Sequence, residues 1–289
     1  RIYELYLFCF FREQLFSFKR DYEAPDFIIE KYGQTIAVEA VTISRKKENF
    51  SNILNFKPKN KEEIDANLEN DVPLMFSSAL FDKVKKKYWE KPHVQGTPFI
   101  IAIADFHDTM SMTWSYNSLL QYLYGYTYSH SFSKSGELIV DPIKIENYEK
   151  TNGTKIPAGF FDDPNNNYIS GILFSSVATL SKFNRLGKQA GLGSNDNILV
   201  RNVILFNHDK NADKPIAKRY IIDENCDETW SEGMTLYHNP NAIHRINRAM
   251  FDEKIAHSFF DFENKDIISL MPDIFPYSNT IENLIIKKD

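Results

Sequence analysis

The sequence predicts an α/β protein, and three features of its first half carry that prediction. Residues 1–18 form a run that is apolar on nearly all sides of a helix, as is typical of a buried helix. Residues 24–30 and 35–42 are two strand-like runs joined by a short segment that contains Gly33. Residues 98–105 (PFIIAIAD) form a continuous apolar run, which indicates a strand buried on both faces.

The remaining elements of the first half follow in chain order. Residues 44–71 are polar and rich in lysine and asparagine, which predicts a surface insertion. A helix is expected over 76–90, where apolar residues recur every four positions, and it ends before Pro92. Another helix is expected over 115–124. Together, residues 1–128 are predicted to form one core.

From about residue 129 onward, turn-rich stretches alternate with strand-like runs. These runs are residues 169–176, 198–206 and 218–223. Residues 129–289 are therefore expected to form a mixed α+β elaboration. This region is either a second lobe or packs with residues 1–128 as part of one domain.

Composition excludes several classes of protein. The net charge is -5, from 34 basic and 39 acidic residues, whereas many nucleic-acid-binding proteins are strongly basic. The net charge does not exclude local basic patches that bind nucleic acid. The two cysteines, Cys9 and Cys226, cannot form a disulfide framework and favour a reducing, cytoplasmic setting. No apolar run is long enough to cross a bilayer, so no membrane is expected. The sequence starts inside the first predicted helix, so residues upstream of Arg1 are expected.

Asp26 and Glu39 are predicted to face each other across a β-hairpin. In a hairpin centred between Tyr32 and Gly33, the numbers of opposed residues sum to 65, and the glycine supplies the backbone freedom that the turn needs. Asp26 and Glu39 then share one face of the sheet, with Cβ atoms roughly 4.5–5.5 Å apart. A change of register by one residue would place them on opposite faces.

Two carboxylates at that distance among apolar neighbours repel each other. Either one of them takes up a proton or a cation lies between them. Mg²⁺, or Mn²⁺, fits a site of oxygen ligands that keeps some of its water, and the Ala40 carbonyl could add a ligand. The alternative is that Asp26 caps a turn after Pro25 while Glu39 pairs with a lysine.

Pro25-Asp26, followed by a strand that carries Glu39, resembles the motif of the PD-(D/E)xK nuclease superfamily. The resemblance implies a restriction-endonuclease-like fold, a mixed β-sheet flanked by helices, in which Asp26 and Glu39 are catalytic metal ligands. It also implies a role for Glu4, on the preceding helix, at the same site. The strings YELYL, AVEAVT, SALFDKVKKKYW and TLSKFNRLG resemble, more narrowly, a little-described group of bacterial proteins with a nuclease-like core.

The sequence departs from the superfamily motif at Val41, where the motif has a lysine. In some members of the superfamily this lysine comes from the neighbouring helix, which here is the helix predicted over 76–90. At about 100° per residue, Lys83 and Lys87 lie on one shoulder of that helix, from which a long side chain can reach the sheet. Lys83 is the first candidate for the catalytic amine and Lys87 the second. The alternative is a solvated run of charge.

Contacts with nucleic-acid phosphates are expected from basic residues in two segments. These residues are Arg45, Lys46 and Lys47 in the polar insertion, and Lys182 and Arg185 in the later SKFNR string. Both groups are also compatible with ordinary surface charge.

Two further groups of polar residues indicate a functional site less clearly. Asp105 and His107 follow the buried strand, where the aspartate either assists the metal site or caps a turn. His238 and His244 lie in an Asn/Pro-rich string that predicts a turn before it predicts a metal or acid–base site.

The predicted function is that of a metal-dependent nuclease that cleaves phosphodiester bonds in DNA rather than RNA, in bacterial defence, with a homodimer as the candidate assembly. The alternative is a catalytically inactive restriction-endonuclease-like module for binding or assembly, which Val41 and the acidic net charge favour. A metal-dependent hydrolase of a small substrate is a third hypothesis.

Overall fold

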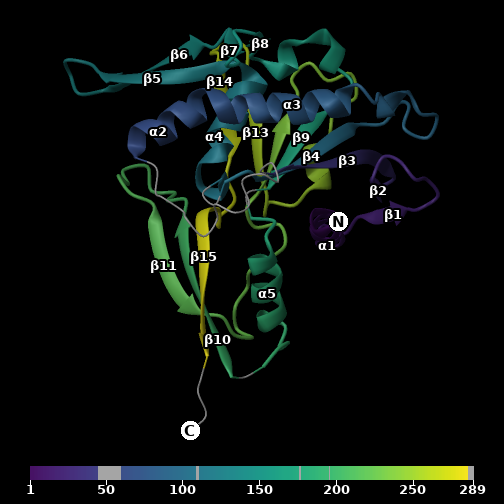
Figure 1. Cartoon of the computed structure of the whole chain (residues 1–289), viewed down its shortest axis with the longest axis vertical. Helices are drawn as coiled ribbons and strands as arrows, with labels where there is room; N and C mark the ends of the chain where they lie inside the picture. The colour runs from purple at the N-terminus through teal and green to yellow at the C-terminus, as the bar shows by residue number, and fades with distance from the viewer. Residues whose placement is uncertain (45–59, 109–110, 176, 195, 286–289) are drawn as a thin grey trace.

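The computed structural model describes residues 1–44, 60–108, 111–175, 177–194 and 196–285. Its centre is a mixed sheet with the strand order β1-β2-β3-β4-β9-β12-β13-β14 (Figure 1). These strands are β1 (Ser17–Lys19), β2 (Phe27–Lys31), β3 (Gln34–Ser44), β4 (Phe99–Phe106), β9 (Gly171–Ser175), β12 (Met234–His238), β13 (Ala256–Asp261) and β14 (Asp266–Leu270). The predicted α/β class, with a large mixed sheet flanked by helices, is confirmed.

Strand direction changes across the sheet. β1, β2 and β3 form an antiparallel meander, and β3, β4 and β9 are parallel neighbours. β12 is antiparallel to β9 and parallel to β13, which is antiparallel to β14. β9, β12, β13 and β14 come from the second half of the chain, so both predicted parts contribute strands to one sheet.

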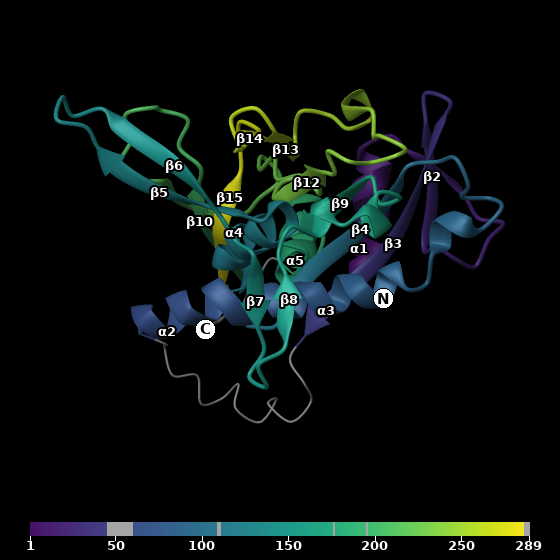
Figure 2. The ribbon, with the colours of Figure 1, turned by 90° about the horizontal axis from the view of Figure 1, so that it is seen from above.

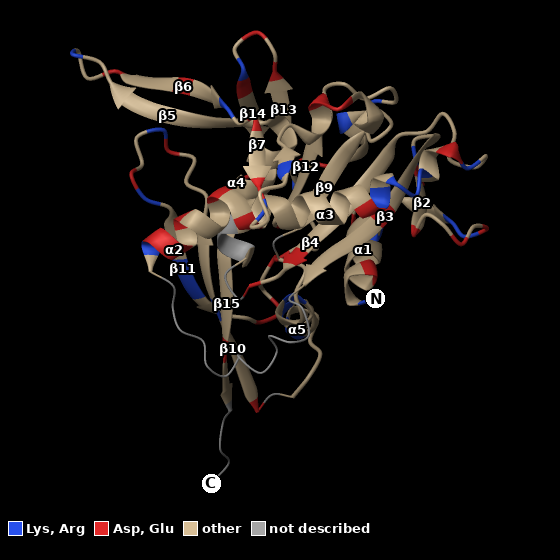
Figure 3. Cartoon of the chain, turned by 45° about the horizontal axis from the view of Figure 1, so that its top comes forward, with Lys and Arg blue, Asp and Glu red and all other residues tan. Residues whose placement is uncertain are grey.

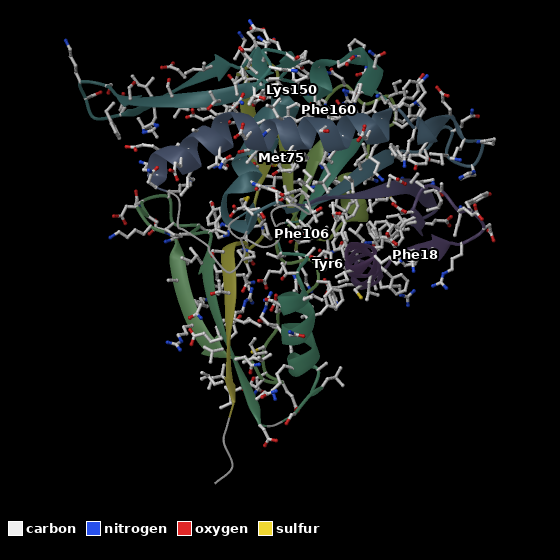
Figure 4. All side chains as sticks on the ribbon, in the orientation of Figure 1. Tyr6, Phe18, Met75, Phe106, Lys150 and Phe160 are labelled. Atoms are coloured by element: carbon white, nitrogen blue, oxygen red, sulfur yellow. The ribbon has the colours of Figure 1, made fainter. Side chains whose placement is uncertain are left out.

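Helices cover both faces of this sheet (Figure 2). α1 (Ile2–Glu13) packs on one face, where its buried aromatic residues meet Ile29, Ile36 and Val38. α3 (Val72–Val84) and α4 (Ser111–Tyr124) pack on the other face, against Ile28 and Ala37. Figure 4 shows Tyr6 and Phe18 on the α1 side and Phe160 on the α3 side.

The long helix in front of the sheet differs from the prediction at both ends. α2 (Lys61–Ala66), a π-helical turn (Asn67–Asp71) and α3 follow one another without a break, so part of the expected polar insertion is helical. The helix ends at Val84 rather than near Glu90, because Lys87 adopts a left-handed backbone conformation with φ 47°. A short 3₁₀ helix (Tyr88–Glu90) follows.

A second, three-stranded sheet has the order β11-β10-β15 and extends toward the C-terminus (Figure 1). Its strands are β10 (Asn197–Leu205), β11 (Ile216–Ile221) and β15 (Pro276–Ile285), and α5 (Leu180–Gln189) lies nearby. β5 (Tyr126–Phe132) pairs with β6 (Leu138–Lys144), and β7 (Asn147–Glu149) pairs with β8 (Lys155–Pro157). Further 3₁₀ turns are Phe160–Asp162, Pro164–Asn166 and Arg248–Met250. Among the described residues, no helix combines the length and apolarity needed to span a membrane.

Candidate active site

The β2–β3 hairpin has the predicted register. Phe27 lies opposite Val38 and Ile28 opposite Ala37, so the numbers of opposed residues sum to 65. The two turn residues, Tyr32 and Gly33, both have positive φ, at 53° and 74°, as a tight two-residue hairpin turn requires. Asp26, one residue before β2, therefore comes opposite Glu39 on the face that α3 covers.

Asp26 and Glu39 are held together by reciprocal hydrogen bonds. The backbone N–H of Ala40 donates to Asp26 Oδ2 at 2.7 Å, and the backbone N–H of Asp26 donates to Glu39 Oε2 at 3.3 Å. Asp26 is open to solvent, whereas the Glu39 side chain is only 5% exposed. The hairpin thus places an accessible carboxylate beside a buried one.

Lys83 completes the group from the last turn of α3. Its ammonium lies 2.6 Å from Glu39 Oε1, and its side chain is only 17% exposed. Figure 3 shows acidic and basic positions meeting where β3 passes α3. A helix therefore supplies a lysine beside Glu39, although β3 carries Val41 where the superfamily motif has one.

Tyr88 is a further member of the site that the sequence analysis did not assign. It is buried, and its hydroxyl hydrogen-bonds the Glu39 carboxylate. Burial, and then the neighbouring Glu39 charge, raise the pKa of Tyr88 to about 12. The apolar spacing predicts Tyr88 as a core-facing residue of the helix expected over 76–90. The left-handed turn at Lys87, which redirects it toward Glu39, has no clear sequence signal.

The electrostatic balance of the site is negative. Partial desolvation raises the pKa of Asp26, as do the charges of Glu39 and Glu4, while the Ala40 N–H and the Lys83 ammonium oppose that rise. Glu4 itself lies on α1, which packs against the other face of the sheet, and its carboxylate is 3.7 Å from the amino group of Arg1. Glu4 thus acts on Asp26 through its charge.

Other predicted site residues lie elsewhere. Lys87 is 60% exposed, and its ammonium lies 3.1 Å from Glu90 rather than beside Glu39. Arg45, Lys46 and Lys47 lie outside the described residues.

The surface position expected for Lys182 and Arg185 is wrong, because both side chains are almost completely buried. Arg185 donates to both oxygens of Glu228 at 2.7 Å, and Lys182 donates to the Glu232 carbonyl at 2.7 Å. Arg201 pairs with Glu232 in the same cluster. These charges attach α5 to the body of the protein and do not face a ligand at the surface.

Asp105 and the histidines are also removed from the carboxylate pair. Asp105 is aligned with Ile43, four positions beyond Glu39 along β3, which corresponds to roughly 13 Å. Its carboxylate bonds His107 at 2.7 Å. His238 ends β12, with the predicted turn after it, and its Nε2 lies 3.0 Å from Nδ1 of His257.

Two pairs of stacked aromatic rings involve segments that are adjacent to site residues in the sequence. Tyr22 stacks on His93 with ring centroids 3.8 Å apart, and the His93 Nε2–H donates to the Ala24 carbonyl, two residues before Asp26. Trp89, next to Tyr88, stacks on Tyr168 at 5.5 Å. Tyr22 and Tyr168 are 45% and 43% exposed. Each stack therefore presents an accessible ring, and the Tyr22 ring lies close to the Asp26 segment through the His93–Ala24 contact.

Two lysines lie beside the Tyr88 ring. The ammonium groups of Lys86 and Lys91 lie 5.7 and 6.0 Å from the centre of the Tyr88 ring. Positive charge thus lies on the outside of a site whose interior is acidic.

The donor set for a cation is small. Among the described residues, no three His, Cys, Asp or Glu side chains group in a way that could hold a metal ion. A cation at this site would therefore be held by two carboxylates, with backbone oxygen or water as its other ligands. No family model, curated protein or solved structure matches this chain.

Proposed function

We propose that this protein is a metal-dependent nuclease of the PD-(D/E)xK type, with a restriction-endonuclease-like core, that cleaves phosphodiester bonds. The observation that carries the proposal is the 2.6 Å contact of Lys83 with Glu39, beside Asp26. Two acids and one amine come from a hairpin and a helix that are separated in the sequence. These are the chemical groups that the superfamily motif combines, with the lysine supplied by the helix.

Asp26 and Glu39 are the residues that would hold Mg²⁺ or Mn²⁺. The residues fit such an ion because both supply hard oxygen ligands and because Glu4 adds negative charge nearby. Partial burial, and after it the charges of Glu39 and Glu4, raise the pKa of Asp26, and a bound cation would offset that repulsion. When bound, such a cation would polarise a phosphate oxygen and lower the pKa of a water molecule.

Lys83 and Tyr88 would supply the remaining chemistry. Lys83 is fixed by its contact with Glu39, from where its ammonium could orient the attacking water and stabilise charge that develops on the phosphate. The Tyr88 hydroxyl and the Asp26 N–H hold the orientation of the Glu39 carboxylate. The site would thus be organised before the substrate binds.

The surroundings of the site favour a nucleic acid as substrate. Exposed rings such as those of Tyr22 and Tyr168 can stack on bases, and Lys86 and Lys91 can contact phosphates. We retain DNA as the expected substrate.

The alternative function is that of an inactive binding or assembly module. One observation favours it: Lys83, Tyr88 and the Asp26 N–H already satisfy Glu39 without a cation. In that case the ion pair only fixes α3 to the sheet. The chain would then bind nucleic acid without cleaving it.

A cleavage assay separates the two functions. Plasmid and oligonucleotide DNA are incubated with wild type, Asp26→Ala and Glu23→Ala, in Mg²⁺, Mn²⁺ or chelator. Glu23 is an exposed acid in the same loop and serves as the matched control. We expect metal-dependent cleavage that Asp26→Ala lowers at least about 100-fold and Glu23→Ala leaves unchanged. Cleavage that survives Asp26→Ala would show that the site is wrongly assigned.

A further inference from the structure

The β5–β6 hairpin projects from the body of the protein (Figures 1 and 2). It forms a two-stranded sheet of its own, and most of it is uncharged (Figure 3). Five of its apolar residues are exposed, namely Phe132 (70%), Leu138 (59%), Val140 (51%), Ile143 (47%) and Ile139 (42%). An isolated two-stranded hairpin is marginally stable in water, and clustered apolar exposure marks interaction sites.

The hydrogen-bond pattern shows which edge of the hairpin is open. Ser133 N–H donates to the Glu137 carbonyl, and Ile145 N–H donates to that of Gly125. In this register, odd-numbered residues bond across the hairpin and even-numbered residues direct their N–H and C=O outward. The outward edge of β6 contains Pro142, which has no N–H, so that edge is a poor partner for another strand.

The outward edge of β5 has no such interruption. Its outward residues are Tyr126, Tyr128, His130 and Phe132, and each has a backbone donor and acceptor. No other strand in the described part of the chain pairs with this edge. β5 is therefore the edge that can accept a further strand.

The sequence of β5 is nearly the same in both directions around Ser129. Tyr128 corresponds to His130, Thr127 to Ser131, and Tyr126 to Phe132. If two copies pair antiparallel about a two-fold axis at Ser129, outward residues meet outward residues and all seven residues overlap. Ring side chains then face ring side chains, and hydroxyls face hydroxyls.

The same register explains the exposure of Phe132. It would bring this ring beside Tyr126 of a second copy. Within each chain, Tyr126 stacks on Phe260 at 5.2 Å, and Phe260 in turn contacts Phe262, which is 57% exposed. The tip of one hairpin would thus be covered by an aromatic cluster at the base of the other.

We propose that the β5 edges of two copies of this chain pair antiparallel about Ser129, forming a continuous four-stranded sheet in a symmetric dimer. The occupant of the open edge is thus a second copy of the chain. This inference does not depend on the proposed nuclease activity, because none of its residues belongs to the Asp26–Glu39 site.

Cross-linking tests the register directly. Ser129→Cys places two thiols opposite each other in a non-hydrogen-bonded pair, with Cα atoms about 4.5 Å apart, within the range for a disulfide. Ser131→Cys is the matched control, because the two copies of that residue would lie roughly 13 Å apart. Wild type gives the background from Cys9 and Cys226. We expect a covalent dimer under mild oxidation for Ser129→Cys only. Equal cross-linking of both variants, or none, overturns the register.

A pair of proline substitutions tests the edge. His130 and Val140 are cross-strand partners, and each directs its N–H outward, the first from β5 and the second from β6. Sedimentation velocity is run up to about 100 µM, with circular dichroism as a check on folding. We expect His130→Pro to raise the dimer dissociation constant at least tenfold and Val140→Pro to leave it within about twofold of wild type. A monomeric wild type, or equal effects of the two variants, overturns the proposal.

Discussion

Replacing Lys83 by methionine is expected to separate a catalytic lysine from a purely structural one. The change keeps most of the alkyl chain and removes the ammonium that lies 2.6 Å from Glu39. Breaking a buried ion pair by removing one partner costs about 3–5 kcal/mol. Lys83 is 17% exposed, and two donors to Glu39 remain, so we expect a loss of about 2 kcal/mol in the free energy of unfolding.

The assay combines urea unfolding with DNA cleavage for Lys83→Met and Lys87→Met. Lys87 pairs only with Glu90 at the surface, so its substitution should change stability by less than about 0.5 kcal/mol and leave cleavage unaltered. If the amine acts in the reaction, cleavage by Lys83→Met should fall at least about 100-fold while the protein stays folded. Unchanged cleavage, with or without lost stability, would refute the catalytic role.

Three further predictions concern substrate binding and pH. Tyr22→Ala removes an exposed stacking ring and should weaken binding of a single-stranded oligonucleotide about tenfold in a fluorescence titration; unchanged affinity would contradict this role. Burial lowers the pKa of Lys182 to about 8, so over the range between that value and the ordinary value of 10.5 the unfolded chain binds more protons than the folded chain. The difference in unfolding free energy between wild type and Lys182→Met should therefore shift by about 2 kcal/mol in favour of wild type from about pH 7 to about pH 9.5. A difference that stays constant over this range would contradict the lowered pKa of Lys182. Burial also lowers the pKa of His238 to about 3 and that of His257 to about 4. Between about pH 7 and about pH 5 these two histidines take up protons in the unfolded chain but not in the folded one. The free energy of unfolding of wild type should therefore fall by about 2–4 kcal/mol over this range. Equal stability at the two pH values would contradict the lowered pKa values.

Local features of the sequence predicted the hairpin well. The register depends on a turn whose residues are adjacent in the chain, so Gly33 was enough to place Asp26 opposite Glu39. The buried strand β4 was equally clear, because a strand covered on both faces needs a continuous apolar run.

Features that depend on distant segments were not predictable in the same way. The end of α3 depends on the left-handed turn at Lys87, which removed that lysine from the site and brought Tyr88 into it. Lys182 and Arg185 appear as surface charge in the sequence, because the glutamates that pair with them lie more than 40 residues further along the chain. A pattern of neighbouring residues does not predict ion pairs between such distant positions.

The central claim is that Asp26 and Glu39 form a cation site with Lys83 beside it. Its most direct test is the anomalous scattering of Mn²⁺ in crystals of wild type grown or soaked in about 10 mM MnCl₂. We predict a peak between the two carboxylates that disappears in Asp26→Ala. No peak at this position, or a peak that persists in the variant, would contradict the account.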